Sequence, residues 1–351
     1  MTAPTQSLPT LAAAYITLGL TLALPSPGRA AETASNGEKD KRTVTVVVEN
    51  DVFYDTDRHY TNGVRASWAG SINGAPRWAA AIADRVPFFP KSGDVHTLYT
   101  LGQNMYVPSD ITQESPPLSD RPYAGWLYGS VGLVKETDKQ LDQLNLSLGI
   151  VGPSAFAEDT QKFVHKVIDS NDPKGWHTQL GNEPALLLSY QRSWREVISR
   201  PVRALTLDVT PTLSAALGNV FTHAGAGATL RFGNITPLRA GTNGRPLDFG
   251  PPRIQPSAPG SVFFFSADRF TWYLFAGVEG RAVARNIFLD GNTFGHSRSV
   301  NSEPWVGDAQ FGFVAAWRDW RASYTHVMRT REFVGQRERD DFGAFSVSIR
   351  F

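Results

Sequence analysis

The chain has no cysteine among its 351 residues. This absence excludes disulfide bonds, thiolate metal sites and a cysteine nucleophile. Neither sign of charge is in excess, because 34 Lys and Arg residues stand against 33 Asp and Glu residues and leave a formal net charge of +1. Without a basic field to attract phosphates, no nucleic-acid partner is expected.

Long apolar runs are scarce. The clearest covers residues 11–24, which is too short for a transmembrane helix and typical of the apolar core of a signal peptide. Gly28 and Ala30 are small residues that suit cleavage after Ala30. We therefore expect a signal peptide over residues 1–30 and a polar, disordered segment over 31–42. No later stretch approaches 18 consecutive apolar residues, so a helical membrane protein is excluded and a soluble exported protein or a β-barrel remains.

Several catalytic signatures are also missing. The chain has no Gly-x-Ser-x-Gly elbow, no His-Glu-x-x-His zinc helix and no phosphate-binding Gly-rich loop. A serine hydrolase is therefore not supported. The histidines, carboxylates and amides that are present suit the activation of water beside a hard cation.

What is present is a series of segments rich in Val, Leu, Phe, Tyr, Trp and Thr, many of them alternating with polar or small residues. We predict twelve strands, at residues 43–52, 60–70, 95–107, 122–135, 140–150, 184–197, 202–217, 222–233, 269–287, 303–317, 320–334 and 342–351. The even number and the lengths near ten match tilted strands that cross a bilayer.

The last segment decides between a barrel and a soluble β-sandwich, which share the period of two. Residues 345–351 alternate strictly, and the chain ends on Phe351 as outer-membrane barrels do. An all-β, antiparallel transmembrane β-barrel of about twelve strands is therefore predicted for residues 43–351, in the bacterial outer membrane. Nothing in the sequence requires more than a monomer.

Aromatic residues near strand ends would form the interfacial girdles of such a barrel, and core packing is the alternative role. They are Trp68, Trp126, Tyr128, Trp272, Tyr273, Trp317 and Trp320.

Strand order brings polar residues to one rim. With both termini in the periplasm, Asn50 and Asp51 lie at the outer end of the first strand, and Thr61 lies at the outer start of the second. The long link 151–183 opens on the same side, so we expect a polar site there. The alternative is that Asn50 and Asp51 only stabilise a turn.

The link contains an amphipathic helix, which Ser154 is expected to cap. We predict that one face of this helix rests on barrel or lipid and that Gln161 and His165 lie on the opposite side, toward a groove. The first face consists of Phe156, Thr160, Phe163, Val164 and Val167. Two simpler interpretations are a solvated histidine and a bare membrane anchor.

Six motifs together resemble the outer-membrane lipid A 3-O-deacylase family, over residues 43–351 and most densely in the first half. They are Glu49-Asn50-Asp51, Asp57-Arg58-x-Tyr60-Thr61-Asn62-Gly63, Asp120 to Trp126, Gly152-Pro153, Gln161-x-x-x-His165 and Gly175-Trp176 through Glu183-Pro184. The resemblance implies a twelve-stranded barrel that releases the 3-linked acyl chain of lipid A, the lipid anchor of lipopolysaccharide, in the outer leaflet and depends on Ca²⁺.

The same resemblance implies roles for particular residues. His165 would be the general base that activates water, and Gln161 would line the site. Asp51 would help to hold Ca²⁺, while Asn50 and Thr61 would orient the substrate or donate to the oxyanion.

One motif of the family is missing. Some members carry a Lys-Arg pair in the second outer loop, and residues 109–114 contain no basic residue here. Arg121 or Lys174 would have to contact the lipid A phosphates instead. An outer-membrane esterase resembling a phospholipase and a non-catalytic pore remain the alternatives to a lipid A deacylase.

Overall fold

The computed structural model describes residues 42–51, 59–71, 75–137, 139–235, 254–255, 258–259 and 267–351. The predicted signal peptide and residues 31–41 of the predicted disordered segment lie outside this part of the chain. Arg42, at the end of that segment, exchanges two backbone hydrogen bonds with Phe351. The first and last strands are therefore joined up to the end of the chain.

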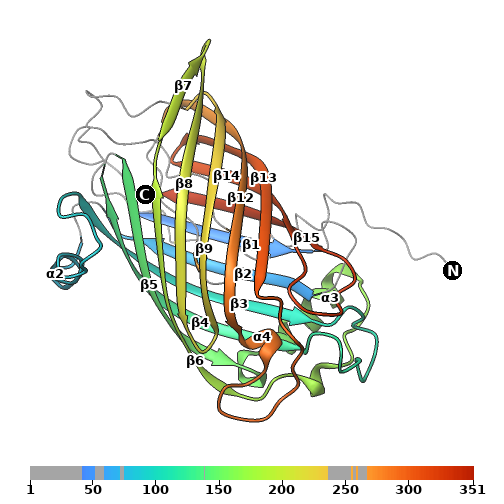
Figure 1. Ribbon diagram of the computed structural model, residues 1–351. Helices are drawn as coiled ribbons and strands as arrows, with labels where there is room; N and C mark the ends of the chain where they lie inside the picture. Colours follow the sequence, from blue (N-terminus) through green and yellow to red (C-terminus); the bar gives the residue numbers. More distant parts are fainter. Residues whose placement is uncertain are drawn as a thin grey trace.

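Twelve antiparallel strands form a closed barrel, which confirms the predicted fold class (Figure 1). They are β1 Thr43–Asn50, β2 His59–Ala69, β3 Asp94–Val107, β4 Ala124–Glu136, β5 Gln140–Val151, β6 Glu183–Trp194, β8 Leu205–Gly218, β9 Phe221–Gly233, β12 Ala267–Asn286, β13 Trp305–Arg318, β14 Trp320–Arg329 and β15 Asp340–Arg350. Each strand pairs with the next, β1 pairs with β15, and the pairing of β6 with β8 completes the circle. Two further two-residue strands, β10 Ile254–Gln255 and β11 Ala258–Pro259, pair with each other.

One predicted turn is wrong. Residues 198–201 were expected to link two strands, but Ile198–Val202 is a strand, β7, which pairs with β8. The turn comes after it, at Arg203, whose φ is 56°. A proline such as Pro201 is tolerated in a strand where its missing N–H does not face a partner.

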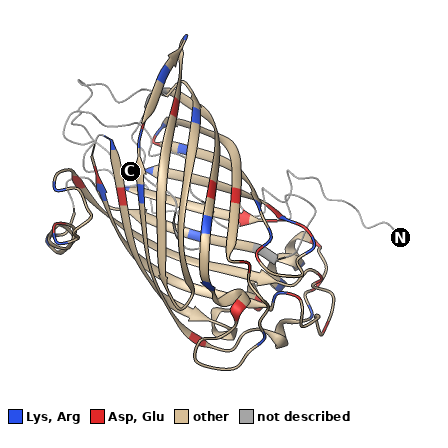
Figure 2. Ribbon diagram, in the orientation of Figure 1, with Lys and Arg blue, Asp and Glu red and all other residues tan. Residues whose placement is uncertain are grey.

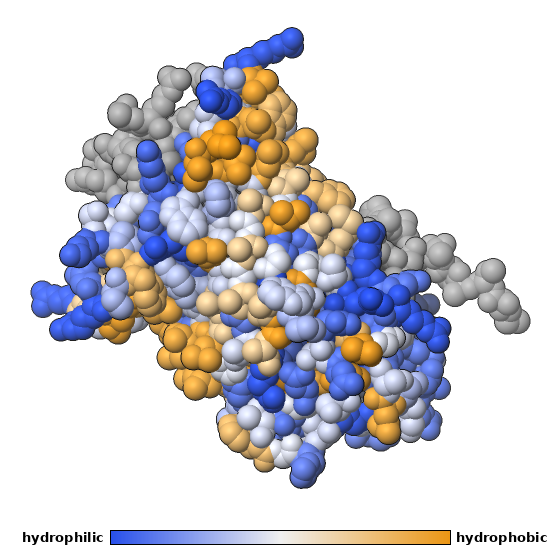
Figure 3. Space-filling model, in the orientation of Figure 1, coloured by the Kyte–Doolittle hydropathy of each residue, from blue (hydrophilic) through white to orange (hydrophobic). Residues whose placement is uncertain are grey.

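The predicted alternation of β15 is confirmed. Ser346 and Ser348 are buried on the inner face of the barrel. Ser346 forms a hydrogen bond with Ser323 of the neighbouring strand at 2.6 Å, and Thr45 donates to Ser348 at 2.8 Å. Ion pairs also occupy the inner face, such as Asp308 with two arginines, and charged residues of both signs appear on the strands in Figure 2. Apolar side chains spread over the outer wall (Figure 3), so the barrel is polar inside and apolar outside.

The aromatic girdle is only partly as predicted. Trp68, Trp317 and Trp320 are 42–54% exposed on the wall, at the end of the barrel that carries Phe351. Trp126, Tyr128 and Tyr273 are buried, so the prediction that they form a girdle is wrong; Trp126 and Tyr128 belong to a core cluster inside the barrel. Because aromatics occur on both faces of a barrel wall, composition at strand ends does not distinguish the two roles. Trp272 is partly buried.

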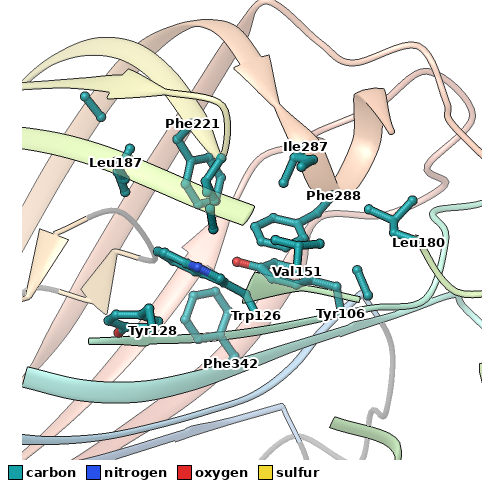
Figure 4. Packing of buried hydrophobic residues seen from close by; sticks show 14 of the residues in the cluster. Tyr106, Trp126, Tyr128, Val151, Leu180, Leu187, Phe221, Ile287, Phe288 and Phe342 are labelled. Carbon is teal, nitrogen blue, oxygen red and sulfur yellow. The ribbon is translucent and has the colours of Figure 1, made fainter. Parts of the chain in front are cut away.

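Helix α4, Ile287–Asp290, closes the other end of the barrel. Its Phe288 is fully buried and stacks on Tyr106, with ring centroids 3.9 Å apart. Trp126 and Tyr128 stack beside them at 4.2 Å, and Phe288 and Trp126 lie close together in Figure 4. Aromatic rings thus fill the mouth, whereas a pore needs an open, polar lumen. Among the described residues, no helix is long and apolar enough to cross a membrane.

Replacing Phe288 by alanine should lower the free energy of unfolding by about 3–5 kcal/mol, because a fully buried ring is lost from a packed cluster. The matched control is Phe294→Ala, in the same loop, where the ring is 77% exposed and a change within about 0.5 kcal/mol is expected. Urea unfolding in detergent micelles measures both. Equal effects would contradict the packing described for the mouth.

Candidate active site

Asn50 of β1 and Asn62 of β2 lie on the outer face of the barrel wall. Glu49 pairs with Arg65 on the inner face, so the alternation of the strand turns Asn50 outward together with Val48. Asn62 lies directly opposite Asn50 in the ladder. Both asparagines are only 2% exposed. Something outside the barrel must therefore cover them.

The cover is helix α3, Ala157–Ile168. Val164 and Ile168 pack on Val48 of β1, and the partly buried Val46 and Val64 extend this contact along β1 and β2. Since Asn50 follows Val48 on the same face, the contact brings the last turns of α3 to the ends of β1 and β2. Figure 1 shows α3 at the end of the barrel opposite α2 and beside α4.

The start of α3 is held close to the wall by small residues. A Cβ at Gly125 would lie 2.5 Å from the Cβ of Ala157, so only glycine permits this approach. The predicted cap is wrong: Phe156 is the N-cap residue, with φ 56°, and Ser154 instead donates its N–H to the Asn182 side chain at 2.8 Å. The helix thus begins at a turn of the loop, where the chain comes into contact with the wall.

The predicted faces of α3 are confirmed only in part, because Val164 was assigned to the same face as Phe163 and Val167 and instead packs on the wall. Gln161 and His165 are 1% and 3% exposed and face the wall together with Val164, whereas Phe163 and Val167 are more than half exposed. Phe163 and Val167 share the exposed side with the charged Asp159, Lys162 and Lys166, as on an amphipathic helix at a membrane interface, while Gln161 and His165 turn toward the protein.

Gln161 is oriented by Trp176, a residue whose role the sequence did not indicate. The indole Nε1–H donates to Oε1 of Gln161 at 2.7 Å. Because an indole nitrogen only donates, the amide oxygen must face Trp176 and the amide nitrogen must face away. That nitrogen, Nε2, is buried and has no hydrogen-bond partner among the described residues. Nε2 of Gln161 is thus a hydrogen-bond donor, close to His165, that lacks an acceptor among the described residues.

His165 is oriented by a backbone carbonyl. Its Nδ1 lies within hydrogen-bond distance of the carbonyl oxygen of Asn171, just after the end of α3. A carbonyl only accepts, so Nδ1 carries the proton and, in the neutral ring, Nε2 carries the lone pair. No sequence pattern indicates such a carbonyl, which is why Asn171 was missed.

His165 also lines an open pocket at the edge of α3. Lys162, Lys166 and Lys174 line the same pocket, together with His177. Acidic residues contribute as well, among them Glu114, Asp169 and Asp172. One of the two predicted phosphate contacts, Lys174, is thus beside His165.

The family is decided by comparison with known proteins. A family model described as "Outer membrane protein LpxR" matches residues 15–351. The chain belongs to the LpxR family. LpxR proteins are lipid A 3-O-deacylases, which are ester hydrolases of the outer membrane, so the predicted family, enzyme class and location are confirmed.

Several solved structures are similar to this chain. LpxR from Salmonella typhimurium is 18% identical, with a TM-score of 0.67 over 88% of this chain and 99% of that chain. The β-domain of the Bordetella autotransporter BrkA, at 9% identity and a TM-score of 0.41, and the KdgM porin, at 6% and 0.35, each align with 88% of this chain and with 97% and 99% of theirs. No curated protein matches.

The remaining predicted residues are placed as follows. Asp51 is 2% exposed at the end of β1. Thr61 belongs to β2, but its side chain lies outside the described residues. Arg121, the second predicted phosphate contact of this LpxR protein, is fully buried, donates to Glu332 at 3.1 Å and lies over the Tyr106 ring. Arg121 is therefore held in the barrel mouth, apart from the exposed Lys174.

A calcium ion requires six to eight oxygen ligands. Within the described ranges, no group of three or more His, Cys, Asp or Glu side chains is placed to hold a metal. The oxygens available beside Asp51 are amide oxygens of Asn50 and Asn62, and Oδ1 of Asn62 is buried with no hydrogen-bond partner among those residues. This donor set suits a hard cation such as Ca²⁺ and does not suit zinc.

The outer loops are joined to one another around this site. Glu183 accepts hydrogen bonds from Asn219 and from the backbone N–H of Thr293 at 2.7 Å. Arg298 donates to the carbonyl oxygen of Pro117 at 2.6 Å and to Thr178 at 3.2 Å. Four separate outer segments are thus connected, and the loop that carries Trp176 is fixed relative to the wall.

Substituting alanine for Val164 should loosen α3 from the wall, because two buried methyl groups are lost at about 0.8 kcal/mol each. Val167→Ala is the matched control: the residue type, helix and gain in helix propensity are the same, but Val167 is 55% exposed. Hydrogen exchange of α3 amides in micelles should be faster only for V164A. Faster exchange for V167A alone would contradict the contact of Val164 with the wall.

Proposed function

We propose that this LpxR protein hydrolyses the 3-linked acyl ester of lipid A in the outer leaflet, with His165 as general base. The observation that carries the proposal is the position of His165 on the side of α3 that faces the wall, beside a buried amide donor and at the edge of an open pocket. Phe163 and Val167, on the exposed side of α3, would lie among lipid, where the acyl chains of the substrate are.

The proton transfer follows from the tautomer. With Nδ1–H bound to the Asn171 carbonyl, Nε2 takes a proton from water as the water oxygen attacks the ester carbonyl carbon. The tetrahedral intermediate then breaks its bond to the 3-oxygen of the sugar, which leaves with the proton from Nε2. Fatty acid and a free hydroxyl result. Nε2 must therefore be unprotonated when the reaction starts, because its lone pair accepts the proton of the water.

Gln161 supplies a donor for the developing negative charge. Its Nε2 is buried and is turned away from Trp176, which satisfies the other end of the amide. A buried donor without a partner is unfavourable by about 1–3 kcal/mol, and an oxygen of the substrate would relieve this. Preorganised donors of this kind stabilise oxyanions without reorganising during the reaction.

Asp51 and Asn50 would hold Ca²⁺, with Asn62 as a further oxygen ligand and Thr61 orienting the substrate. These residues would hold a positive charge that could polarise the ester carbonyl. The burial of the Asp51 carboxylate, 2% exposed, beside two amide side chains supports this assignment. Lys174 would contact a lipid A phosphate, since it is exposed at the pocket that His165 lines. Arg121 would act there only if the barrel mouth rearranged.

The first test is mass spectrometry of lipid A from cells that produce the protein. The wild type should remove one 3-linked hydroxyacyl chain, and His165→Ala should reduce the rate by about 10²–10⁴-fold, the usual contribution of a general base. His296→Ala, which removes an exposed histidine from the outer loop 287–304, should keep full activity. Intact lipid A with the folded wild type, or an active H165A variant, would contradict the proposal.

The second test concerns the orientation of Gln161. Trp176→Phe keeps a ring but removes the indole donor, and kcat should fall about tenfold with KM unchanged, which corresponds to about 1.4 kcal/mol. Trp126→Phe is the control: this indole is also buried, but its Nε1 has no hydrogen-bond partner among the described residues. Equal losses in the two variants would show that packing alone is responsible.

The third test concerns the metal. Chelation with EDTA should abolish deacylation and added Ca²⁺ should restore it, because a cation held by Asp51 is proposed to polarise the ester carbonyl. Asp51→Asn should raise the Ca²⁺ concentration needed for half-maximal activity at least tenfold. Asp110→Asn, which removes a carboxylate that accepts hydrogen bonds from Thr112 and Gln113 in an outer loop, should leave it unchanged. Full activity in chelator would rule out the metal.

A further inference from the structure

A second helix lies against the outer wall, at the opposite end of the barrel from α3. Helix α2, Arg77–Ala83, buries Ala79 and Ala83 against Leu133 of β4, with Phe89 completing the contact. The side chain of Leu133 faces outward, since it is adjacent to the lumen-facing Val134. Figure 1 shows α2 beside the wall at the end where the C-terminus lies. The loops that carry α3 and α4 lie at the other end, which is the extracellular one because the long loops of such barrels face outside the cell. The end with α2 is therefore periplasmic.

The segment that follows α2 covers charges on the outer wall. Asp142 of β5 is fully buried and accepts from Arg192 Nε at 2.8 Å and from the Tyr190 hydroxyl. Arg192 also donates to the carbonyl oxygen of Phe88, and Phe88 packs edge-on against Tyr190, with centroids 4.5 Å apart. An ion pair on a lipid-facing wall is unfavourable unless it is enclosed. Residues 77–89 therefore pack as a fixed part of the outer surface of the barrel wall.

The other side of this segment is apolar. Trp78, Ile82 and Phe88 are 44–45% exposed. They adjoin a wall whose outward residues on β4 and β5, Val131 and Leu146, are exposed to a similar degree. Exposed aromatic and aliphatic side chains at the end of a lipid-facing wall are typical of the interface between hydrocarbon and head groups.

Basic residues surround the apolar side. Arg77, Arg85 and Lys91 are all exposed, whereas the acidic Asp84 is paired with Lys135 at 3.0 Å. Long basic side chains at this depth extend toward head groups and attract negative charge. The charge on this surface therefore fits an anionic phospholipid, not a zwitterionic one.

The spacing of the two helices agrees with a membrane. Val95 of β3 packs with α2, and Met105 of the same strand belongs to the cluster that contains Ala157 of α3. Ten residues at about 3.3 Å each give about 33 Å along the strand, or about 25 Å along the membrane normal at a tilt near 40°. The apolar band of a barrel is about 25 Å tall. The helices thus lie at its two boundaries.

We propose that α2 and the residues up to Lys91 form a docking surface for anionic phospholipid in the periplasmic leaflet. Trp78, Ile82 and Phe88 enter the acyl boundary, and Arg77, Arg85 and Lys91 bind head groups. This contact fixes the depth of the barrel and thereby the height of α3 in the outer leaflet. The proposal does not depend on the catalytic roles assigned above.

The absence of cysteine allows a direct test. A nitroxide spin label at Ile82→Cys, in the whole protein reconstituted into vesicles, is compared with a label at Ser92→Cys, an exposed position in the adjacent turn. The label at 82 should be accessible to oxygen and protected from a water-soluble nickel chelate, and the label at 92 should show the reverse. A label at 82 that is open to nickel means that α2 faces water, and one that is closed to both reagents means that protein covers it. Either result overturns the proposal.

The head-group assignment is tested with vesicle composition. Adding phosphatidylglycerol to phosphatidylcholine vesicles should move the label at 82 deeper, and the combined variant R77A/R85A/K91A should lose this shift. Equal depth in both vesicles would overturn the assignment of an anionic lipid. All variants change exposed side chains, and resistance of the barrel to SDS without heating checks that each remains folded.

Discussion

The contact of Val164 and Ile168 with Val48 is the interaction on which the site depends. It holds α3 against the outside of the barrel and so places His165 and Gln161 beside the ends of β1 and β2. Because α3 is enclosed between wall and lipid, polar groups can converge where acyl chains are present. The closed mouth of the barrel agrees with a site on the outer face. Phe288 and Trp126 fill the lumen, which therefore does not serve as a channel beside the site.

The strands were predictable because a barrel repeats one simple pattern. Alternation in segments such as 345–351 and the number of segments were sufficient for the barrel, and parity placed Asn50 and His165 at the same end. The motifs from Glu49 to Pro184 indicated the LpxR family before any contact was known. What these features share is that they are local or periodic, so a single sequence displays them.

The orientation of α3 was predictable only in part. The sequence left open whether the apolar face would rest on the barrel or on lipid, and it placed Val164 on the same face as Val167. The structure exposes Val167 and packs Val164 on the wall, because the direction of burial depends on what surrounds the helix. The partners of the two central side chains were missed for another reason. Trp176 and the Asn171 carbonyl come from the loop that follows the helix, and their hydrogen bonds depend on tertiary geometry. Likewise, Arg121 pairs with Glu332, which lies more than 200 residues later in the chain, so no local sequence pattern indicates this contact.

Cross-linking of α3 to β1 tests the location of the site most directly. Single cysteines at Val48 and Val164, in a chain that has no other cysteine, should be joined by a short bifunctional thiol reagent in outer membranes. A pair at Val48 and Val167 should not react, because Val167 is on the lipid side of the helix. The joined fragments are detected on a gel after cleavage between the two positions. Cross-linking at 167 and not at 164 would contradict the account, since His165 and Gln161 would then face away from Asn50 and Asp51.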